Sequence, residues 1–296
     1  MTDLSGVIAA AATPLDEAGE IDQQKLIGHC KWLLEAGGCD AVNLLGTTGE
    51  ATSFSLQQRL EAMSHISKSG LPMSRFMVGT GAAAIADALA LTKAADDLGF
   101  AGALLVPPFY YKGISEDAVT DYVQRIIDGA GLKRAKLYLY HIPQFSGVPY
   151  TINIVERLAQ KNPDVLRGVK DSSGDLSYSK ELARRLPDIA VFPSSEGTLS
   201  SANEHRFAGC ISATTNVNGT LAQEAWRSRG TDAGRRAGEQ ALAIRETLSR
   251  FPLVPAVKWA VSLIHRDPFW RRLQPPLVSL SPDQAETLEA ALPGLT

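Results

Sequence analysis

Residues 166–175 read Leu166-Arg167-Gly168-Val169-Lys170-Asp171-Ser172-Ser173-Gly174-Asp175, a short apolar run that ends at a lysine and is followed by a polar turn. A run of this kind predicts a buried β-strand with Lys170 at its carboxyl end. An ammonium group held there is desolvated, which lowers the pKa of an amine and favours its attack on a ketone. The alternative is a lysine that keeps its charged end in water above an apolar stem. This segment alone favours neither interpretation.

The same pattern of a short apolar run and a longer segment with helical periodicity recurs along the chain, bounded by glycine and proline. The predicted strands span residues 7–12, 41–45, 75–78, 102–106, 136–140, 166–169, 189–192 and 209–212. The predicted helices between them span residues 22–36, 55–67, 85–98, 115–129, 152–161, 176–186 and 198–207. Eight βα units predict an α/β protein with a (β/α)8 TIM barrel, whose active site lies at the carboxyl ends of the strands. An open doubly wound sheet is less favoured, because no G-x-G-x-x-G follows the first strand.

The pattern changes near residue 220. Helix-like segments at 222–248, 254–265 and 282–292 follow one another without a strand between them. We therefore expect a catalytic barrel over residues 1–220 and a C-terminal three-helix extension over residues 221–296. Such an extension often forms an oligomer interface.

Composition restricts the class of function. The 296-residue chain has 45% hydrophobic residues and a formal charge of −3, which argues against a nucleic-acid partner or a polybasic membrane site. Its three cysteines have no disulfide or zinc spacing and fit a reducing compartment. The N-terminus has no basic leader, and no apolar run reaches membrane-spanning length. We expect a cytoplasmic protein that acts on a small molecule.

Two polar turns follow predicted strands. Gly46-Thr47-Thr48-Gly49-Glu50 follows the second strand, and its backbone N–H groups and two hydroxyls are suited to hold a carboxylate. A turn that only caps the next helix is the alternative. Pro107-Pro108-Phe109-Tyr110-Tyr111 follows the fourth strand and is interpreted either as part of the site or as a rigid aromatic loop.

A tyrosine ends the fifth predicted strand. Alternation along the strand places Tyr138 and Tyr140 on one face and His141 on the other. The Tyr140 phenol can relay protons to a substrate oxygen, and a buried tyrosine with no catalytic role is the alternative. The carboxylates that follow the later strands have no histidine or acidic neighbours at metal-ligand spacing, so neither a metal nor a cofactor is expected.

Three motifs occur in order: G-T-T-G-E at 46–50, Y-x-x-P at 140–143, and G-V-K-D-x-x-G-D at 168–175. Together they resemble the dihydrodipicolinate synthase and N-acetylneuraminate lyase family of pyruvate-dependent class I aldolases. The resemblance runs from Thr13-Pro14 to Lys258-Trp259 and Pro275-Pro276 in the tail. It implies a (β/α)8 barrel with a three-helix tail, a homotetramer, and a lysine imine formed with a 2-oxo acid.

The resemblance also assigns roles to residues. Lys170 matches the imine-forming lysine, and Tyr140 matches the tyrosine that moves protons during imine formation and carbon–carbon bond chemistry. Thr47 matches the hydroxyl that links this tyrosine into a relay. Tyr110 matches the aromatic residue that completes the relay across a subunit interface.

The substrate-binding positions follow in the same way. Thr48 and Gly49 match the turn that holds the keto-acid carboxylate, and Ile211 matches a backbone contact on strand eight. Ser195 and Glu196 are candidates for binding substrate hydroxyls, with helix capping as an equal alternative.

The sequence departs from the family where the second substrate binds. Dihydrodipicolinate synthases carry an arginine at the position of Phe145, and a phenyl ring cannot form its bidentate ion pair with a carboxylate. In sialic acid lyases Glu196 has a counterpart, but Gly197 and Ala213 stand where an acid and a serine are expected.

We therefore predict a Schiff-base lyase, an aldolase or dehydratase that acts on pyruvate or on a 2-keto-3-deoxy sugar acid or related hydroxy-2-oxo acid. The alternatives are 4-hydroxy-tetrahydrodipicolinate synthase, N-acetylneuraminate lyase and a non-catalytic keto-acid-binding member of the family.

Overall fold

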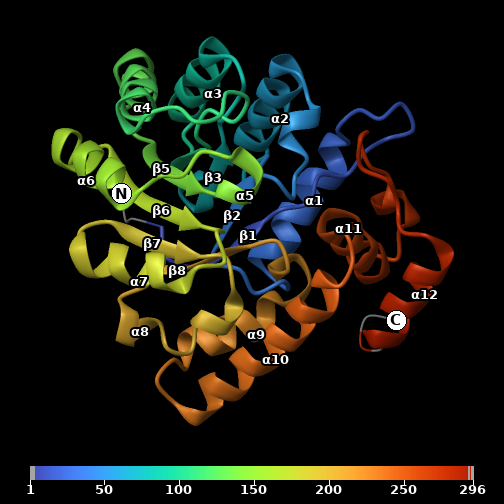
Figure 1. Cartoon of the computed structure of the whole chain (residues 1–296). Helices are drawn as coiled ribbons and strands as arrows, with labels where there is room; N and C mark the ends of the chain where they lie inside the picture. The colour runs from blue at the N-terminus through green and yellow to red at the C-terminus, as the bar shows by residue number, and fades with distance from the viewer. Residues whose placement is uncertain (1–3, 293, 295–296) are drawn as a thin grey trace.

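Eight parallel strands form the centre of the computed structural model, which describes residues 4–292 and 294 (Figure 1). The strands are β1 Gly6–Ala10, β2 Ala41–Leu44, β3 Phe76–Gly79, β4 Gly102–Leu105, β5 Lys136–His141, β6 Leu166–Asp171, β7 Ala190–Pro193 and β8 Gly209–Ser212. They pair in the order β7-β6-β5-β4-β3-β2-β1-β8. The N–H of Ala208 donates to Val191 O at 2.9 Å and joins β7 to the start of β8. The predicted TIM barrel is confirmed.

Helices connect the strands and surround the barrel (Figure 1). They are α1 Gln23–Leu34, α2 Leu56–Lys68, α3 Ile85–Asp97, α4 Glu116–Ala130, α5 Pro143–Ser146, α6 Ile152–Lys161, α7 Leu176–Arg185, α8 Ala202–His205, α9 Thr215–Arg227, α10 Asp232–Ser249, α11 Leu253–Ile264 and α12 Pro282–Ala291. Short 3-10 turns are η1 Ala51–Ser53, η2 Met73–Arg75, η3 Glu196–Thr198 and η4 Pro268–Arg271. Several helices begin at a hydroxyl residue that accepts a backbone N–H of the first turn, as Ser55, Ser115 and Thr151 do.

The strands bury both faces, as alternation predicts for a parallel barrel. One set of apolar side chains packs against the surrounding helices, and a smaller set fills the barrel interior. Tyr138 occupies the interior between Gly102 and Gly168, where a Cβ would lie 2.8 Å and 2.6 Å from its ring atoms. Gly102 and Gly168 therefore together give this ring its space, and Gly168 lies two residues before Lys170.

Two helix predictions are wrong. The single helix expected over residues 222–248 is two helices, α9 and α10, separated at Gly230, whose φ is +80°. Thr231 begins α10 by accepting the N–H of Gly234. The helix expected over residues 198–207 is reduced to η3 and α8, because Arg206 adopts a left-handed φ of 58° that ends α8. Gly230 and the capping residue Thr231 indicate a helix break in the sequence, but the apolar periodicity continues across them and predicts a single helix.

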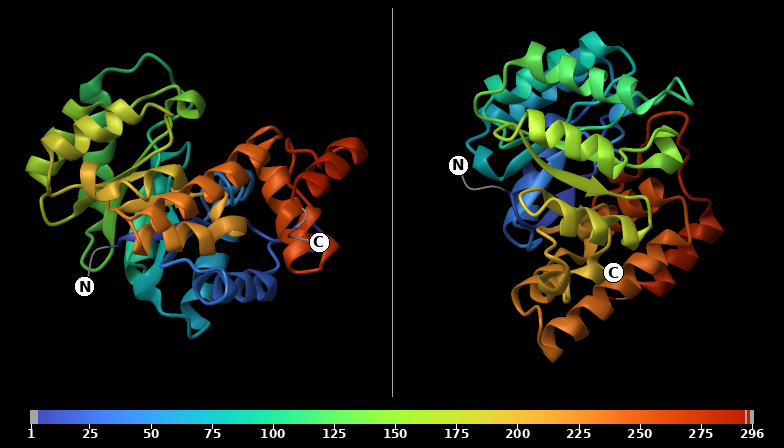
Figure 2. Two further views of the ribbon diagram at one scale, coloured as in Figure 1. Left: turned by 90° about the horizontal axis from the view of Figure 1, so that it is seen from below. Right: turned by 60° about the vertical axis from the view of Figure 1, so that its left-hand side comes forward.

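The C-terminal helices α10, α11 and α12 lie to one side of the barrel (Figure 2). Helix α9 runs across residue 220, where the sequence had suggested the end of the barrel part. The α10–α11 connection and the segment before α12 both reach the mouth of the barrel, where Pro252 and Leu277 line a cavity. Among the described residues, no helix is long and apolar enough to cross a membrane.

Candidate active site

Lys170 and Tyr140 face each other inside the barrel mouth. They are register partners on β6 and β5, so both side chains point to the interior. Lys170 is 3% exposed and Tyr140 6%, and Lys170 Nζ lies 4.1 Å from the centroid of the Tyr140 ring. An amine and a phenol are thereby held together with little exposure to solvent.

Tyr140 also contacts the turn after β2. Its hydroxyl lies 3.3 Å from Thr47 Oγ1, at hydrogen-bonding distance. Burial raises the pKa of the Tyr140 phenol, but the charge of Lys170 and hydrogen bonds with Thr47 and Ser172 outweigh it. The pKa of Tyr140 therefore lies below its ordinary value. Lys170, Tyr140 and Thr47 therefore form a chain of polar groups through which a proton can pass.

The turn at residues 46–50 presents unused backbone donors. Glu50 adopts a left-handed φ of 55°, and the N–H of Glu50 closes the turn on Thr47 O at 3.1 Å. The N–H groups of Thr48 and Gly49 donate to no other described residue. Gly49 lies in a tight space, because a Cβ there would lie 3.1 Å from Ala11 O and from Leu45 N. A turn of this kind is suited to bind an anion.

A buried ion pair holds this turn against the C-terminal helices. Lys258 Nζ on α11 donates to Glu50 Oε1 at 2.6 Å, and both side chains are fully buried. Glu50 Oε2 accepts the N–H of Gln274 at 2.7 Å. The tail is therefore bonded directly to the turn, and the sequence reasoning did not connect Lys258 with Glu50.

A cavity of about 440 Å³ joins these groups. Lys170, Tyr140, Thr47, Thr48 and Ile211 all line it. The barrel thus brings together predicted site residues from four separate segments of the sequence. A second cavity of about 310 Å³ adjoins the first at Thr47, Tyr140 and Phe145.

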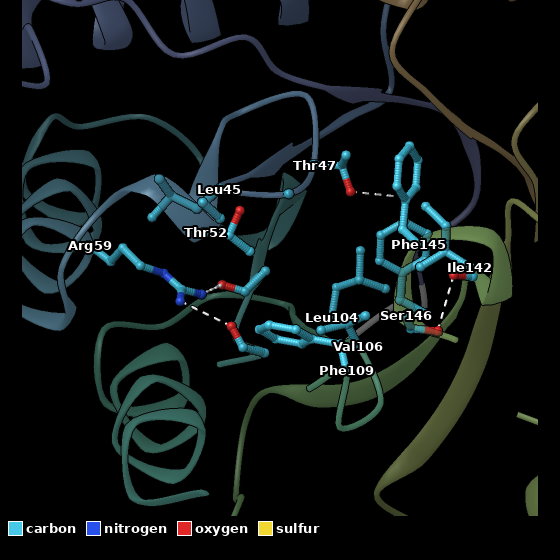
Figure 3. Close-up of a pocket in the computed structure, with 15 residues that line it drawn as sticks. Leu45, Thr47, Thr52, Arg59, Leu104, Val106, Phe109, Ile142, Phe145 and Ser146 are labelled. Carbon is cyan, nitrogen blue, oxygen red and sulfur yellow. Dashed lines mark hydrogen bonds between the residues drawn. The ribbon is translucent and has the colours of Figure 1, made fainter. Parts of the chain in front are cut away.

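Figure 3 shows the second cavity, with Arg59 on one side and Phe145 on the other. Arg59 is 4% exposed, and its Nη1 and Nη2 donate to the carbonyls of Gly81 and Gly79. Burial lowers the pKa of Arg59 to about 10. The guanidinium therefore closes one end of this cavity while it is bonded to backbone.

The remaining predicted residues lie in different surroundings. Phe145 lines both cavities but is 71% exposed, and Tyr110 is 76% exposed with its ring edge against Tyr111. Ser195 accepts the N–H of Gly197 at the start of η3. Glu196 is fully buried and accepts from Ser212 Oγ at 2.7 Å, so it faces the β8 segment and does not line either cavity.

Arg245 is a cavity residue that the sequence reasoning missed. It extends from α10, and its Nη1 donates to Ser194 O at 2.7 Å. Together with Lys170 it is one of two cations among the described residues that line the 440 Å³ cavity. Its helix lies outside the barrel repeat, so strand-end reasoning did not consider it.

The whole chain matches a known family. Residues 3–294 match the Dihydrodipicolinate synthetase family. The chain belongs to this family. An uncharacterised DapA-like lyase from Chloroflexus aurantiacus is 34% identical over 295 residues, which cover 98% of this chain and 97% of the relative. The protein is therefore a lyase of the dihydrodipicolinate synthetase family.

Solved structures of the family have the same fold. A crystal structure of dihydrodipicolinate synthase from Agrobacterium tumefaciens superposes with a TM-score of 0.89 at 31% identity, covering 99% of both chains. A variant of the 2-keto-3-deoxygluconate aldolase of Sulfolobus solfataricus gives a TM-score of 0.85 at 20% identity, covering 98% of this chain and 96% of the aldolase. The second likeness concerns the fold alone.

Proposed function

We propose that this protein is a Schiff-base lyase that cleaves or dehydrates a 2-keto-3-deoxy sugar acid or a related hydroxy-2-oxo acid, with pyruvate as the smallest 2-oxo acid it binds. The observation that supports this most directly is the buried pair of Lys170 Nζ and the Tyr140 ring, 4.1 Å apart. The adjoining turn at Thr48 offers an anion site for the 2-oxo acid carboxylate.

In the proposed mechanism the neutral amine of Lys170 attacks C2 of the 2-oxo acid, and the carbinolamine loses water to give a protonated imine. Tyr140 supplies the proton to the departing oxygen, and Thr47 holds the phenol in place. In cleavage the C4 hydroxyl loses its proton, the C4 fragment leaves as an aldehyde, and the electron pair of the C3–C4 bond moves into the protonated imine to give an enamine. Protonation at C3 and hydrolysis of the imine by water then release pyruvate and restore the Lys170 amine. In dehydration a C3 proton is removed, and the C4 hydroxyl takes up a proton and leaves as water.

The choice of substrate class rests on Phe145. This ring stands where an arginine would bind the carboxylate of the second substrate in a dihydrodipicolinate synthase, so that activity is not the one we propose. We further propose a cytoplasmic homotetramer in which the exposed Tyr110 enters the site of a neighbouring subunit.

The test is to trap the imine. Incubation with pyruvate and borohydride, followed by intact-mass measurement, is expected to give a pyruvyl-sized adduct in the wild type and none in Lys170→Ala. A wild-type protein without the adduct, or an adduct that persists in the variant, would refute the imine mechanism. Condensation of pyruvate with aspartate semialdehyde is assayed in parallel, because robust turnover there would contradict the proposed substrate class.

A further inference from the structure

We infer that Arg245 makes this enzyme selective for 2-oxo acids with a second acidic end, by binding a terminal carboxylate remote from the Schiff-base lysine. The inference rests on the proposed function, since it assigns a substrate class to the same cavity.

Arg245 is held at the carboxyl ends of β7 and β8, and it lines the same cavity as Lys170. Its Nη1 donates to Ser194 O at 2.7 Å and to Ser212 Oγ at 3.2 Å. The N–H of Ser194 in turn donates to Asp171 O, next to Lys170. Neighbouring strands lie about 5 Å apart, so the guanidinium sits over the barrel mouth within reach of a substrate bound at Lys170.

Part of the guanidinium is available to a ligand. All the hydrogen bonds that Arg245 makes with described residues come from Nη1, which leaves Nε and Nη2 without such a partner. The side chain is 22% exposed and lines the cavity. Nε and Nη2 lie on one edge of the planar group, and this edge matches the two oxygens of a carboxylate.

The charges around Arg245 favour a ligand group with one negative charge over a group with two. Glu196 Oε2 lies 3.5 Å from Arg245 Nη1 and is fully buried. This carboxylate also accepts from Ser212 and Thr214, which hold it in place. The arginine is thus already partly neutralised, and a carboxylate monoanion suits the site better than a phosphate dianion.

The second acidic residue at the cavity does not compete for Arg245. Glu50 is bonded to Lys258 and accepts the N–H of Gln274, so its carboxylate is already occupied. A substrate with carboxylates at both ends therefore has a separate site for each: the turn at Thr48 for the 2-oxo acid end, and Arg245 for the far end. This placement also compensates for the uncharged Phe145, since the carboxylate is bound from α10 instead of from the segment after β5.

The test compares 2-oxo acids that differ only at the far end. 2-Oxoglutarate is paired with 2-oxopentanoate, and 2-oxoadipate with 2-oxohexanoate, so that each pair has equal chain length and one member has a terminal carboxylate. In each case the Lys170 amine forms an N–C2 bond, water leaves, and borohydride reduces the imine. Intact mass gives the concentration that half-saturates trapping, and calorimetry on Lys170→Ala, which lacks the amine, measures binding without any imine.

For at least one pair, we expect the diacid to half-saturate the wild-type enzyme at a concentration roughly tenfold or more below that of the monoacid of equal length. Arg245→Gln is expected to remove this preference, and Arg245→Lys to keep only part of it. Arg236→Gln changes an exposed arginine of the same helix and serves as the matched control. If the variants do not fold, equal half-saturation of wild type by both members of each pair still overturns the inference.

Equal half-saturation by both members of each pair in wild type, or a preference that persists in Arg245→Gln, would overturn the inference. So would an equal loss of pyruvate trapping in Arg245→Gln, which would show damage to the whole site. Strong competition by inorganic phosphate against the diacid would overturn the choice of a carboxylate. If wild-type enzyme traps no 2-oxo acid at all, the imine mechanism fails, and the calorimetric comparison still decides the role of Arg245.

Discussion

After the charge of Lys170, the hydroxyl of Thr47 is the next interaction that lowers the pKa of the phenol that we propose as the proton carrier. Its hydrogen bond, with the charge of Lys170, lowers the pKa of Tyr140 below the ordinary value against the effect of burial. A phenol that donates a proton must be protonated, so activity is expected to fall on the alkaline side as this group ionises. The alkaline fall in kcat/KM should lie below pH ~10, because the unperturbed pKa of tyrosine is about 10.

Thr47→Val tests this relation. Removing the hydroxyl removes one of the interactions that lower the pKa of Tyr140, so its pKa rises and the alkaline limb of kcat/KM moves to higher pH. Tyr140→Phe should remove this limb and lower turnover by roughly 10²–10⁴-fold with folding retained. Thr287→Val, on an exposed part of α12, is the control. An alkaline limb at the same pH in Thr47→Val would contradict the relay.

Among the elements, α11 is attached to the barrel by a charge pair without contact to solvent. Lys258→Met leaves Glu50 buried and unpaired, so we expect a loss of roughly 3–5 kcal/mol in the free energy of unfolding. Equilibrium urea denaturation measures it. Lys25→Met breaks an ion pair of the same 2.6 Å length in which the side chains are 32% and 25% exposed, and its cost should stay below about 1 kcal/mol.

A loss in Lys258→Met no larger than that in Lys25→Met would show that the buried pair adds nothing to the attachment. Glu50→Gln combined with Lys258→Met should recover part of the loss, because an uncharged amide replaces the unpaired carboxylate. Pyruvate trapping in Lys258→Met is expected to need a higher pyruvate concentration, since the turn that we propose as the carboxylate site loses its support.

The strands and helices that the sequence predicts are those marked by a pattern of neighbouring residues. Apolar runs and helical periodicity are set within a few residues, so all eight strands were found, and strand alternation placed Tyr140 on the interior face. Parallel register then brought Tyr140 beside Lys170. Arg245 and Lys258 escaped prediction because their roles depend on how helices outside the repeat pack; Lys258 meets its partner 208 residues away.

At the scale of the whole molecule, aromatic rings near the barrel mouth are exposed to an unusual degree. Tyr110, Tyr111 and Phe145 are 76%, 73% and 71% exposed in the single chain. Large exposed apolar groups that lie together indicate a surface that another protein covers. We interpret this surface as the contact with a second copy of the chain, in agreement with the proposal that Tyr110 acts in a neighbouring site.

Mixing two inactive variants distinguishes action within a subunit from action between subunits. Lys170→Ala lacks the amine, and Tyr110→Phe is expected to lack the end of the proton relay. In a mixed oligomer, a subunit with an intact Lys170 receives an intact Tyr110 from its neighbour, so activity should return after the two proteins are unfolded and refolded together. Each variant refolded alone is the control, and sedimentation verifies that mixed oligomers form. If Tyr110 acts within its own subunit, every site in the mixture still lacks one group, and no activity returns.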